Sequence, residues 1–357
     1  MFDNILQGFG IDPNDCHIQP FGPGLINRTY KVSSRSKEYI LQRINVNVFK
    51  SPENIARNLA LLQSYLEKTE PEYLFVAPIP SVSGDLLVKA SPGNVFRLFP
   101  FVQGSQTINS ISSERQAFEA ARQFGKFTRL LKDFETDQLE YTLTDFHNLP
   151  LRFEQFKEAS QGAVQERSGL ASNEIKEAYK YQYILETYNQ LIANDEIPLR
   201  VIHHDTKISN ILFDDQQNGL CVIDLDTVMP GYYLSDVGDM MRTYLSAVNE
   251  EEADLSKIYI REDVFSAIYK GYMSEMGSVL TEKEKRCFIF SGKLMIYMQA
   301  LRFLTDFLDN DAYYETKYPE HNLVRAKNQL RLLSEYEKAG ETLGHLITKA
   351  QKNPLSV

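Results

Sequence analysis

Hydrophobic and polar positions in the first hundred residues follow a strand pattern, interrupted by one helical interval. Segments rich in β-branched and aromatic side chains, bounded by turn residues, predict strands at 17–24, 25–34, 37–46, 84–89 and 94–99. Ser51-Pro52-Glu53 is a typical helix start, and apolar residues then recur at helical spacing to about residue 68. This part of the chain should form a small β-rich lobe.

The pattern changes after Pro100–Gly104, which interrupts the last strand and which we interpret as a hinge. From Ser112 onward helical periodicity dominates, and it predicts helices near 113–132, 150–160, 172–194, 235–248, 262–276, 282–309 and 321–348. Within this region, residues 200–228 instead predict two short strands around a loop. We therefore expect an α+β protein with an N-terminal lobe (1–102), a larger C-terminal lobe (103–357) and a cleft between them.

Composition narrows the class of protein. The chain has 357 residues and a net charge of −10, which disfavours binding to nucleic acid or to an anionic membrane. No apolar run has the length of a membrane span, and the N-terminus lacks the pattern of a signal peptide. The three cysteines are scattered without metal-ligand spacing. We expect a cytoplasmic protein with no evident obligate protein partner.

The region 201–228 carries the candidate chemistry. His203-x-Asp205-x-x-x-x-Asn210 is followed by an apolar strand that ends in Ile223-Asp224. Transfer of a phosphoryl group to a hydroxyl needs one carboxylate to accept or orient the hydroxyl proton, and hard oxygen ligands to hold Mg²⁺. Asp205 fits the first role, and Asn210 with Asp224 fits the second. Loop aspartates are also common as solvated turn residues, so the second motif is what favours function.

Several neighbours of these residues keep two interpretations. His203 is expected to support the loop backbone. His204 is either an ordinary loop residue or a substrate contact. Asp226 is either a further metal or substrate ligand or a solvated strand end, and Lys207 either reaches the transferring phosphoryl group or faces solvent.

These residues resemble the aminoglycoside phosphotransferase and choline kinase superfamily, whose fold is protein-kinase-like. The likeness to N-acetylhexosamine 1-kinases within it covers nearly the whole chain, through the segments FGPGLINRTY (21–30), YILQRIN (39–45), FRLFPFVQGS (96–105), DFHN (145–148), CVIDLDTVMPG (221–231) and RFLTD (302–306). The resemblance implies ATP-dependent phosphorylation of the anomeric hydroxyl of N-acetylglucosamine or N-acetylgalactosamine. It makes Asp205 the catalytic base, Asn210 and Asp224 the Mg²⁺ ligands, and Asp236 a buttress of the catalytic loop.

Candidate acceptor ligands lie in the C-terminal lobe. An anomeric hydroxyl is more acidic than an ordinary alcohol, so a carboxylate base suffices. Sugar selectivity needs several hydrogen bonds and an aromatic face, and the candidates are His147, Asn148, Asp226, Arg302 and Tyr313. The resemblance implies ligand contact for Arg302. The simpler interpretation is a salt bridge to Asp306 at the i+4 position.

Candidate nucleotide contacts lie in the N-terminal lobe and the hinge. Gly22 and Gly24 allow close approach of a strand–turn–strand to phosphates, and the other candidates are Asn27, Arg43, Phe101 and Val102. This fold uses a cation on the third strand, and alternation places Leu41 and Arg43 on one face with Gln42 on the other. We assign Arg43 to the cleft, with Leu41 lining the adenine pocket. No acid lies between Asn54 and Tyr65 on the next helix, so the usual partner glutamate is not evident.

Two alternatives to a sugar 1-kinase remain. The first is a kinase of the same fold that acts on an aminoglycoside, choline, homoserine or methylthioribose. The second, from another class, is a catalytically silent nucleotide-binding module. The intact set Asp205, Asn210 and Asp224 argues against the silent module.

Overall fold

The N-terminal lobe is built on an antiparallel sheet. The computed structural model describes all residues except 1, 23, 25, 36, 92 and 353–357, and in this part of the chain the strand order is β1-β2-β3-β5-β4. The strands are β1 (His17–Pro20), β2 (Arg28–Ser33), β3 (Glu38–Ile44), β4 (Val88–Ser91) and β5 (Asn94–Pro100).

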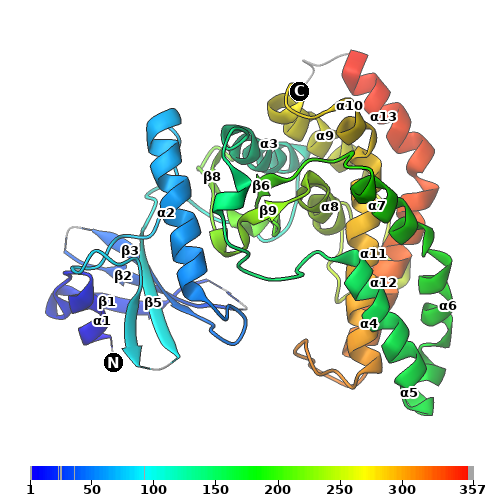
Figure 1. Ribbon diagram of the computed structural model, residues 1–357, viewed down its shortest axis with the longest axis horizontal. Coiled ribbons are helices and arrows are strands. Elements are labelled where there is room, and N and C mark those ends of the chain that lie inside the picture. Colours follow the sequence, from blue (N-terminus) through cyan, green and yellow to red (C-terminus); the bar gives the residue numbers. More distant parts are fainter. Residues whose placement is uncertain (1, 23, 25, 36, 92, 353–357) are drawn as a thin grey trace.

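Helices pack against the two faces of this sheet. The short helix α1 (Asp3–Gly8) buries Ile5 and Leu6 in a cluster with Leu41 and Phe96 on one face. Helix α2 (Pro52–Thr69) lies toward the other lobe, and its apolar residues belong to the large core that continues into the C-terminal helices. Figure 1 shows α2 standing between the sheet and the rest of the molecule. The second face of the sheet therefore looks toward the C-terminal lobe.

The chain passes between the lobes just after β5. The N–H of Phe101 still donates to the carbonyl of Glu38 at 3.1 Å, as an extension of the β3–β5 ladder. Gly104 then has a φ of +69°, a left-handed conformation that glycine adopts without strain. Gln106 forms a reciprocal pair of backbone hydrogen bonds with Phe213, both 2.9 Å, which anchors the connection in the C-terminal lobe.

The C-terminal lobe is mainly helical and is organised around α11, a long apolar helix that packs against α4, α8 and α12. Figure 1 shows α11 and α12 running side by side through this lobe. The helices are α3 (Glu114–Leu130), α4 (Leu149–Gly162), α5 (Gln165–Leu170), α6 (Ser172–Lys180), α7 (Tyr183–Ala193), α8 (Tyr233–Tyr244), α9 (Glu262–Met276), α10 (Glu282–Arg286), α11 (Phe288–Leu308), α12 (His321–Lys338) and α13 (Gly340–Lys352).

Two small antiparallel pairs interrupt the helices. Strand β6 (Arg200–Ile202) pairs with β9 (Met229–Gly231), and β7 (Ile211–Phe213) pairs with β8 (Gly219–Val222). The connections between these strands therefore lie close together at one edge of the lobe, facing the N-terminal sheet.

The expected α+β architecture with a β-rich first lobe and a helical second lobe is confirmed. Three predicted helices are divided in two: 172–194 breaks at Tyr181 and Gln182, 282–309 at Cys287, and 321–348 at Ala339. Only one or two residues separate the two helices at each joint, and the sequence pattern does not show so short an interruption.

The strand predicted at 84–89 is displaced. Residues 81–85 form a turn in which Ser81 N–H donates to the carbonyl of Asp85 at 2.8 Å, and Gly84 has a φ of +89°. The strand itself occupies Val88–Ser91. The sequence pattern does not predict helices α1 and α5, since six residues are too few to establish a helical period.

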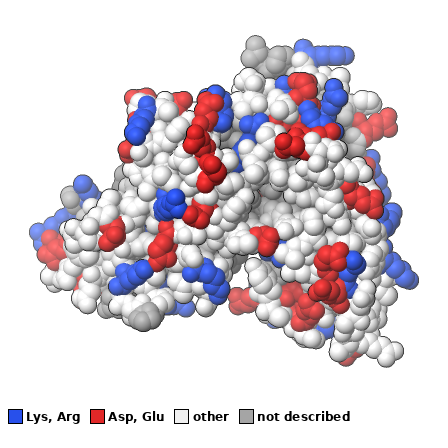
Figure 2. Space-filling model, in the orientation of Figure 1, with Lys and Arg blue, Asp and Glu red and all other residues white. Residues whose placement is uncertain are grey.

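On the face shown in Figure 2, acidic and basic side chains are interspersed. This face therefore shows no continuous basic patch that could bind a polyanion such as nucleic acid. Among the helices of the described residues, none is both long and apolar enough to cross a bilayer.

The contact between α8 and α11 depends on a glycine. A Cβ at Gly238 would lie 2.1 Å from the carbonyl oxygen of Ser291, so Gly238→Ala should lower the free energy of unfolding by about 1–3 kcal/mol through overpacking. A Cβ at Gly344, within α13, would meet no atom within 4 Å, and Gly344→Ala should raise the same free energy by about 0.5–1 kcal/mol. Urea denaturation of both variants measures whether the free energy of unfolding changes in opposite directions. An equal change in the two variants would contradict this account of the packing.

Candidate active site

The loop that follows β6 is held by its backbone. The N–H groups of His203 and His204 both donate to the carboxylate of Asp236, at 2.9 and 2.7 Å. The N–H of Thr206 donates to Asp239 at 2.9 Å. Both acids project from α8 and are buried. The loop conformation is therefore fixed by two carboxylates rather than by regular secondary structure, and Asp236 supports the loop as a buttress would.

The negative charges of Asp236 and Asp239 are balanced in different ways. Asp239 pairs with Arg242, which also contacts Glu250, at 2.9 and 2.8 Å. Asp236 has hydrogen-bond donors but no ion-pair partner in the described part of the chain, and burial raises its pKa to about 6. Nearby His203 and the two backbone N–H groups act to lower the same pKa.

His203 joins this loop to the turn that follows β8. Its Nδ1 accepts a hydrogen bond from the N–H of Asp205, so Nε2 carries the proton and donates to the carbonyl of Ile223 at 2.9 Å. Its own carbonyl accepts from Thr227 Oγ1 at 2.6 Å. The expectation that His203 supports the loop is confirmed.

Asp205 is the partly exposed carboxylate of the loop. Lys207 Nζ lies 3.1 Å from its Oδ1. Burial acts to raise the pKa of Asp205, but Lys207 and His203 outweigh it and the pKa lies below its usual value. Asp205 is thus ionised at neutral pH and can accept a hydrogen bond from an acceptor hydroxyl. Lys207, whose pKa Asp205 raises, stands beside the carboxylate rather than pointing away from it.

Asn210 and Asp224 present oxygen donors next to this loop. Asn210 donates its Nδ2 hydrogen to the carbonyl of Asp205 at 2.9 Å, which leaves its side-chain oxygen available, and its own carbonyl accepts from Ile223 N–H. Asp224 has a φ of +58°, and its side chain reaches solvent. Surrounding protein nevertheless displaces much of the water, and burial, Asp226 and Asp205 raise its pKa to about 7.

This donor set fits a hard divalent cation. An amide oxygen and a carboxylate are the ligands that Mg²⁺ takes alongside phosphate oxygens. The repulsion that Asp224 experiences from two other carboxylates would be relieved by a dication. Asn210 and Asp224 are therefore the residues that would hold the metal.

Asp226 does not point into a free space beside Asp224. It is buried, forms an ion pair with Arg97, and accepts a hydrogen bond from Asn27 Nδ2 at 2.7 Å. Of the two interpretations that the sequence offers, a ligand or a solvated strand end, the solvated strand end is wrong. The oxygens of Asp226 are engaged by the N-terminal lobe.

The face assignment of β3 made from the sequence is wrong. Leu41 lies in the cluster beneath α1, and Arg43 aligns in register with Phe96 of the same cluster. Gln42 instead faces the other lobe and is paired in register with Arg97. Arg43 is therefore on the far face of the sheet from the catalytic loop, because α1 rather than the cleft covers that face.

The β1–β2 connection and the segment 100–104, which we interpret as a hinge, complete the N-terminal side of the site. Gly22 has a φ of +73° with open space around it, and the Phe21 ring lies edge-on to Phe101 at 6.0 Å. Gly24 is close to the carbonyl of Asn27. Residues 23 and 25 of this connection lie outside the described residues. In the hinge, the carbonyl of Val102 accepts from Ser105, whereas the N–H of Val102 has no hydrogen-bond partner among the described residues.

A cluster of rings adjoins the catalytic loop on the C-terminal side. His147 stacks on Phe146 with centroids 4.3 Å apart, and His204 lies 5.5 Å from His147. Arg302 lies over Phe146, Tyr313 and Tyr314, at 5.7, 5.9 and 5.5 Å from their centroids. The structure therefore brings His147, Arg302 and Tyr313 together around one group of rings.

The contacts of Asp306 and Asn148 decide between the roles that the sequence offers for residues of this cluster. Asp306 does not pair with Arg302, because it accepts the N–H groups of Tyr313 and Tyr314 at 2.7 and 2.9 Å. Asn148 caps α4, accepting from Leu151 N–H at 3.1 Å and donating to Asp145 at 2.7 Å. Both polar groups of Asn148 are thus used within the protein, so its expected ligand role lacks support.

The sequence did not predict the left-handed backbone conformation of His204 or the hydrogen bonds that hold it. Its φ is +66°, its N–H is held by Asp236, and its Nδ1 donates to the carbonyl of Thr227 at 3.1 Å. Burial, followed by His203, lowers its pKa to about 3, so the ring is neutral. A Cβ on Gly231 would meet the Nε2 atom of this ring, which shows how closely the ring is packed.

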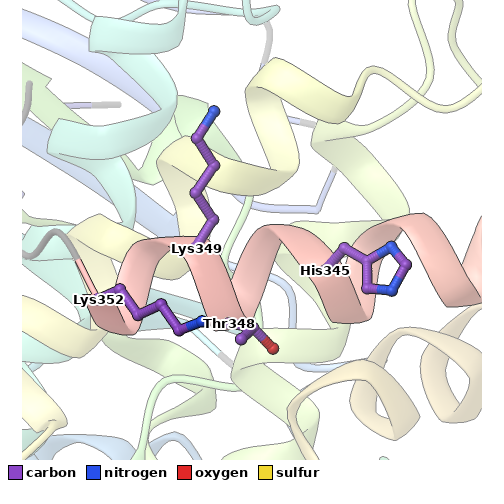
Figure 3. Close-up of a pocket in the computed structure, with 4 residues that line it drawn as sticks. All are labelled: His345, Thr348, Lys349 and Lys352. Carbon is purple, nitrogen blue, oxygen red and sulfur yellow. The ribbon is translucent and has the colours of Figure 1, made fainter.

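A hollow of about 280 Å³ lies elsewhere, along α13. Its lining residues are His345, Thr348, Lys349 and Lys352, all on this one helix (Figure 3). None of the residues that converge on the catalytic loop is among them. This hollow is therefore not the candidate active site.

Residues 17–263 match the model of the phosphotransferase enzyme family, and the chain belongs to that family. The fold is similar to a spectinomycin phosphotransferase solved with ADP and spectinomycin (TM-score 0.60, 13% identity, covering 94% of this chain and 98% of that one). It is also similar to a microcompartment-associated aminopropanol kinase (TM-score 0.65, 15% identity, covering 96% of this chain and 97% of that one). A third similar structure is choline kinase from Cryptosporidium parvum (TM-score 0.55, 15% identity, covering 99% of each chain). The expected protein-kinase-like fold is confirmed.

The buttress can be tested by one conservative change. Asp236→Asn leaves one oxygen acceptor and turns an NH₂ group toward a backbone N–H, so a buried donor loses its partner. We expect the free energy of unfolding to fall by about 1–3 kcal/mol and kcat to fall with it. Urea denaturation and kcat per folded enzyme measure both. Asp215→Asn, at an exposed position, is the control, and an Asp236→Asn enzyme with native kcat would contradict the buttress role.

The pKa of Asp224 predicts a pH-dependent metal requirement. Below a pKa of about 7 this carboxyl becomes protonated and a proton competes with Mg²⁺, whereas at higher pH it is ionised. The apparent Kd for Mg²⁺ should therefore rise, by up to about tenfold per pH unit, as the pH falls below about 7. Mg²⁺ titrations of activity at several pH values, corrected for Mg²⁺–ATP association in solution, check this. A pH-independent Kd would exclude Asp224 as a titrating ligand.

Proposed function

We propose that the protein transfers the γ-phosphoryl group of ATP to the anomeric hydroxyl of an N-acetylhexosamine, giving the sugar 1-phosphate and ADP. The observation that carries this proposal is the environment of Arg302. Its guanidinium faces three aromatic rings and hydrogen-bonds Gln299 at 3.2 Å, and no carboxylate in the described part of the chain forms an ion pair with it. The proposed acceptors are N-acetylglucosamine and N-acetylgalactosamine.

The charge around this cluster favours a neutral acceptor over a cationic one. The pKa of His147 is held well below its ordinary value by burial first, then by His204, Arg302, Arg242 and Arg152. Of these groups Arg302, Arg242 and Arg152 are cations, and cations that disfavour a charge on a buried imidazole also disfavour a cationic ligand beside it. Recognition of an ammonium group would need a carboxylate or an uncompensated ring face instead.

The same residues suit a sugar with an acetamido group. Aromatic rings such as Tyr313, which is largely exposed, can cover the apolar face of a pyranose. Arg302 offers N–H donors to hydroxyl or amide oxygens. The Nδ1 atom of His147 is buried without a hydrogen-bond partner among the described residues, and such an atom is costly to leave unpaired, so a ligand hydroxyl would satisfy it.

The chemistry then rests on the catalytic loop. Asp205 accepts the proton of the acceptor hydroxyl as that oxygen forms its bond to the γ-phosphorus and the bond to the ADP oxygen breaks. Lys207, 3.1 Å from Asp205, supplies positive charge next to the transferring group. A Mg²⁺ ion held by Asn210 and Asp224 would neutralise phosphate charge. Asp236 and Asp239 keep the loop in place throughout.

The nucleotide is assigned to the space between the N-terminal sheet and the hinge. Gly22 and Gly24 in the β1–β2 connection allow close approach of phosphates, and the N–H of Val102 is a candidate donor to adenine beside the Phe101 ring. Arg43 is not part of this site. Arg97 of β5 is a cation on the cleft face of the sheet, one strand away from the position expected; Lys31 of β2 shares this face and pairs with Glu38 at 2.8 Å.

The alternative is a kinase of the same fold with a cationic acceptor. Proteins of similar fold act on spectinomycin, aminopropanol and choline, according to their names. The acidic residue that kept this alternative open is Asp226, and it is engaged by Arg97 and Asn27. The alternative therefore loses its main support within the site.

A panel of acceptors tests the proposal. With Mg²⁺ and ATP, N-acetylglucosamine or N-acetylgalactosamine should give ADP release and a phosphatase-labile, reducing-end-blocked product, whereas choline and an aminoglycoside should give none above background. Asp205→Asn provides the enzyme-dependent background. Turnover of an amine without turnover of either N-acetylhexosamine would overturn the proposal.

A change at Arg302 separates acceptor binding from chemistry in the same assay. Arg302→Met keeps the aliphatic stem over the rings but removes the donors, and it should raise the sugar KM by about tenfold while leaving the ATP KM unchanged. Arg331→Met removes a partly exposed ion pair with Glu335, on α12 and outside the ring cluster, and serves as the control. An unchanged sugar KM in Arg302→Met would remove Arg302 from the acceptor site.

A further inference from the structure

Arg97 is a buried cation of the N-terminal sheet and lies beside a glutamine. Gln42 occupies the cleft-facing site on β3, and Arg97 faces it from β5 in direct register. Gln42 Oε1 accepts hydrogen bonds from both Nε and Nη2 of Arg97, at 3.1 and 2.8 Å. Where protein kinases place a cation on the third strand, this sheet has Gln42, which orients the guanidinium of Arg97 on the neighbouring strand. Lys31 of β2 lies on the same face but pairs with Glu38 at 2.8 Å.

The acid that pairs with Arg97 comes from the other lobe. In protein kinases the partner is a glutamate on the following helix, whereas α2 directs the buried Asn58 at the C-terminal lobe, where it bonds the carbonyls of Glu140 and Val228. Arg97 instead pairs with Asp226, and the two side chains are only 2% and 3% exposed. A buried ion pair between two lobes is strongly destabilised if either partner is removed alone.

Asp226 is linked to both halves of the site. Toward the N-terminal lobe, Asn27 of the β1–β2 connection donates to it at 2.7 Å, and Asn45 N–H fixes the side-chain oxygen of Asn27 at 3.0 Å. Toward the catalytic loop, the adjacent Thr227 donates to the carbonyl of His203 at 2.6 Å and accepts from His204 at 3.1 Å. The ion pair is therefore adjacent in sequence to the residue that contacts the backbone of the catalytic loop.

We propose that Arg97, Asp226 and Asn27 form an interlobe clamp that sets the position of the ATP-binding lobe over the catalytic loop, in place of the strand-lysine and helix-glutamate pair of protein kinases. Arg97 and Asp226 act as positioning residues. They align the phosphoryl donor with Asp205 without touching the reacting atoms. The proposal requires only phosphotransferase activity and is independent of which acceptor is used.

The test uses single variants and their combination. Arg97→Gln and Asp226→Asn should each lower kcat by about 30-fold or more, while the Kd for Mg²⁺–ADP stays within about threefold of the native value. The double variant should be no worse than the poorer single variant, because the two residues act as one unit. If no acceptor of the panel is turned over, the slow hydrolysis of ATP provides the rate, so failure of the sugar proposal does not decide this one.

Matched controls separate the clamp from general interlobe contact. Arg57 and Glu140 also form an ion pair between α2 and the C-terminal lobe, but their side chains are 57% and 44% exposed. Arg57→Gln should keep kcat within about twofold, since exposed pairs contribute little. If Arg97→Gln does not fold, Asn27→Ala removes one contact to Asp226 without leaving a buried charge unpaired, and it should lower kcat at constant Kd for Mg²⁺–ADP.

Three outcomes would overturn the clamp. A lower melting temperature with kcat per folded enzyme preserved would assign the pair to fold stability alone. Weaker Mg²⁺–ADP binding in Arg97→Gln, with tighter binding in Asp226→Asn, would make Arg97 a phosphate ligand. A rise in acceptor KM confined to Asp226→Asn would make Asp226 an acceptor ligand.

Discussion

The candidate active site depends on the carboxylates of Asp236 and Asp239, which accept the backbone N–H groups of His203, His204 and Thr206. A loop without helical or sheet hydrogen bonds must satisfy its buried N–H groups in another way. Here one helix, α8, does so with two acids one turn apart, and Gly238 between them allows that helix to approach α11 closely. The backbone of the loop that carries Asp205 is therefore anchored to α8, which favours one orientation of Asp205.

This support extends outward through a second chain of contacts. His203 and Thr227 connect the catalytic loop to the turn that carries Asp224, and Asp226 connects that turn to Arg97 and Asn27 in the N-terminal lobe. The apolar core follows the same route, since residues of α2 pack with the C-terminal helices. The smaller cluster under α1 stays within the N-terminal lobe.

The proximity of Asp205, Asn210 and Asp224 could be predicted from the sequence, because they lie on adjacent short segments. The orientation of β3 could not. Strand alternation separates Leu41 and Arg43 from Gln42, but only the covering elements decide which face meets the cleft, and α1 is too short to be recognised from its period. Similarly, helical spacing offers Asp306 to Arg302. Nothing in that spacing shows that the N–H groups of Tyr313 and Tyr314 take both oxygens of Asp306.

The distribution of charge explains where a metal ion would enter the cleft. Asp205 is paired with Lys207, Asp226 with Arg97, and Asp239 with Arg242, while Asp236 accepts backbone donors. Asp224 alone among these cleft acids has neither an ion pair nor a side-chain hydrogen bond within the described residues, and burial, then Asp226 and Asp205, raise its pKa to about 7. A carboxylate next to two others, exposed to solvent on one side, gains most from a dication. Cations or backbone N–H groups of the protein engage the acids that keep the loop and the lobes in place. Asp224 is therefore the residue that would bind the metal of the phosphoryl donor.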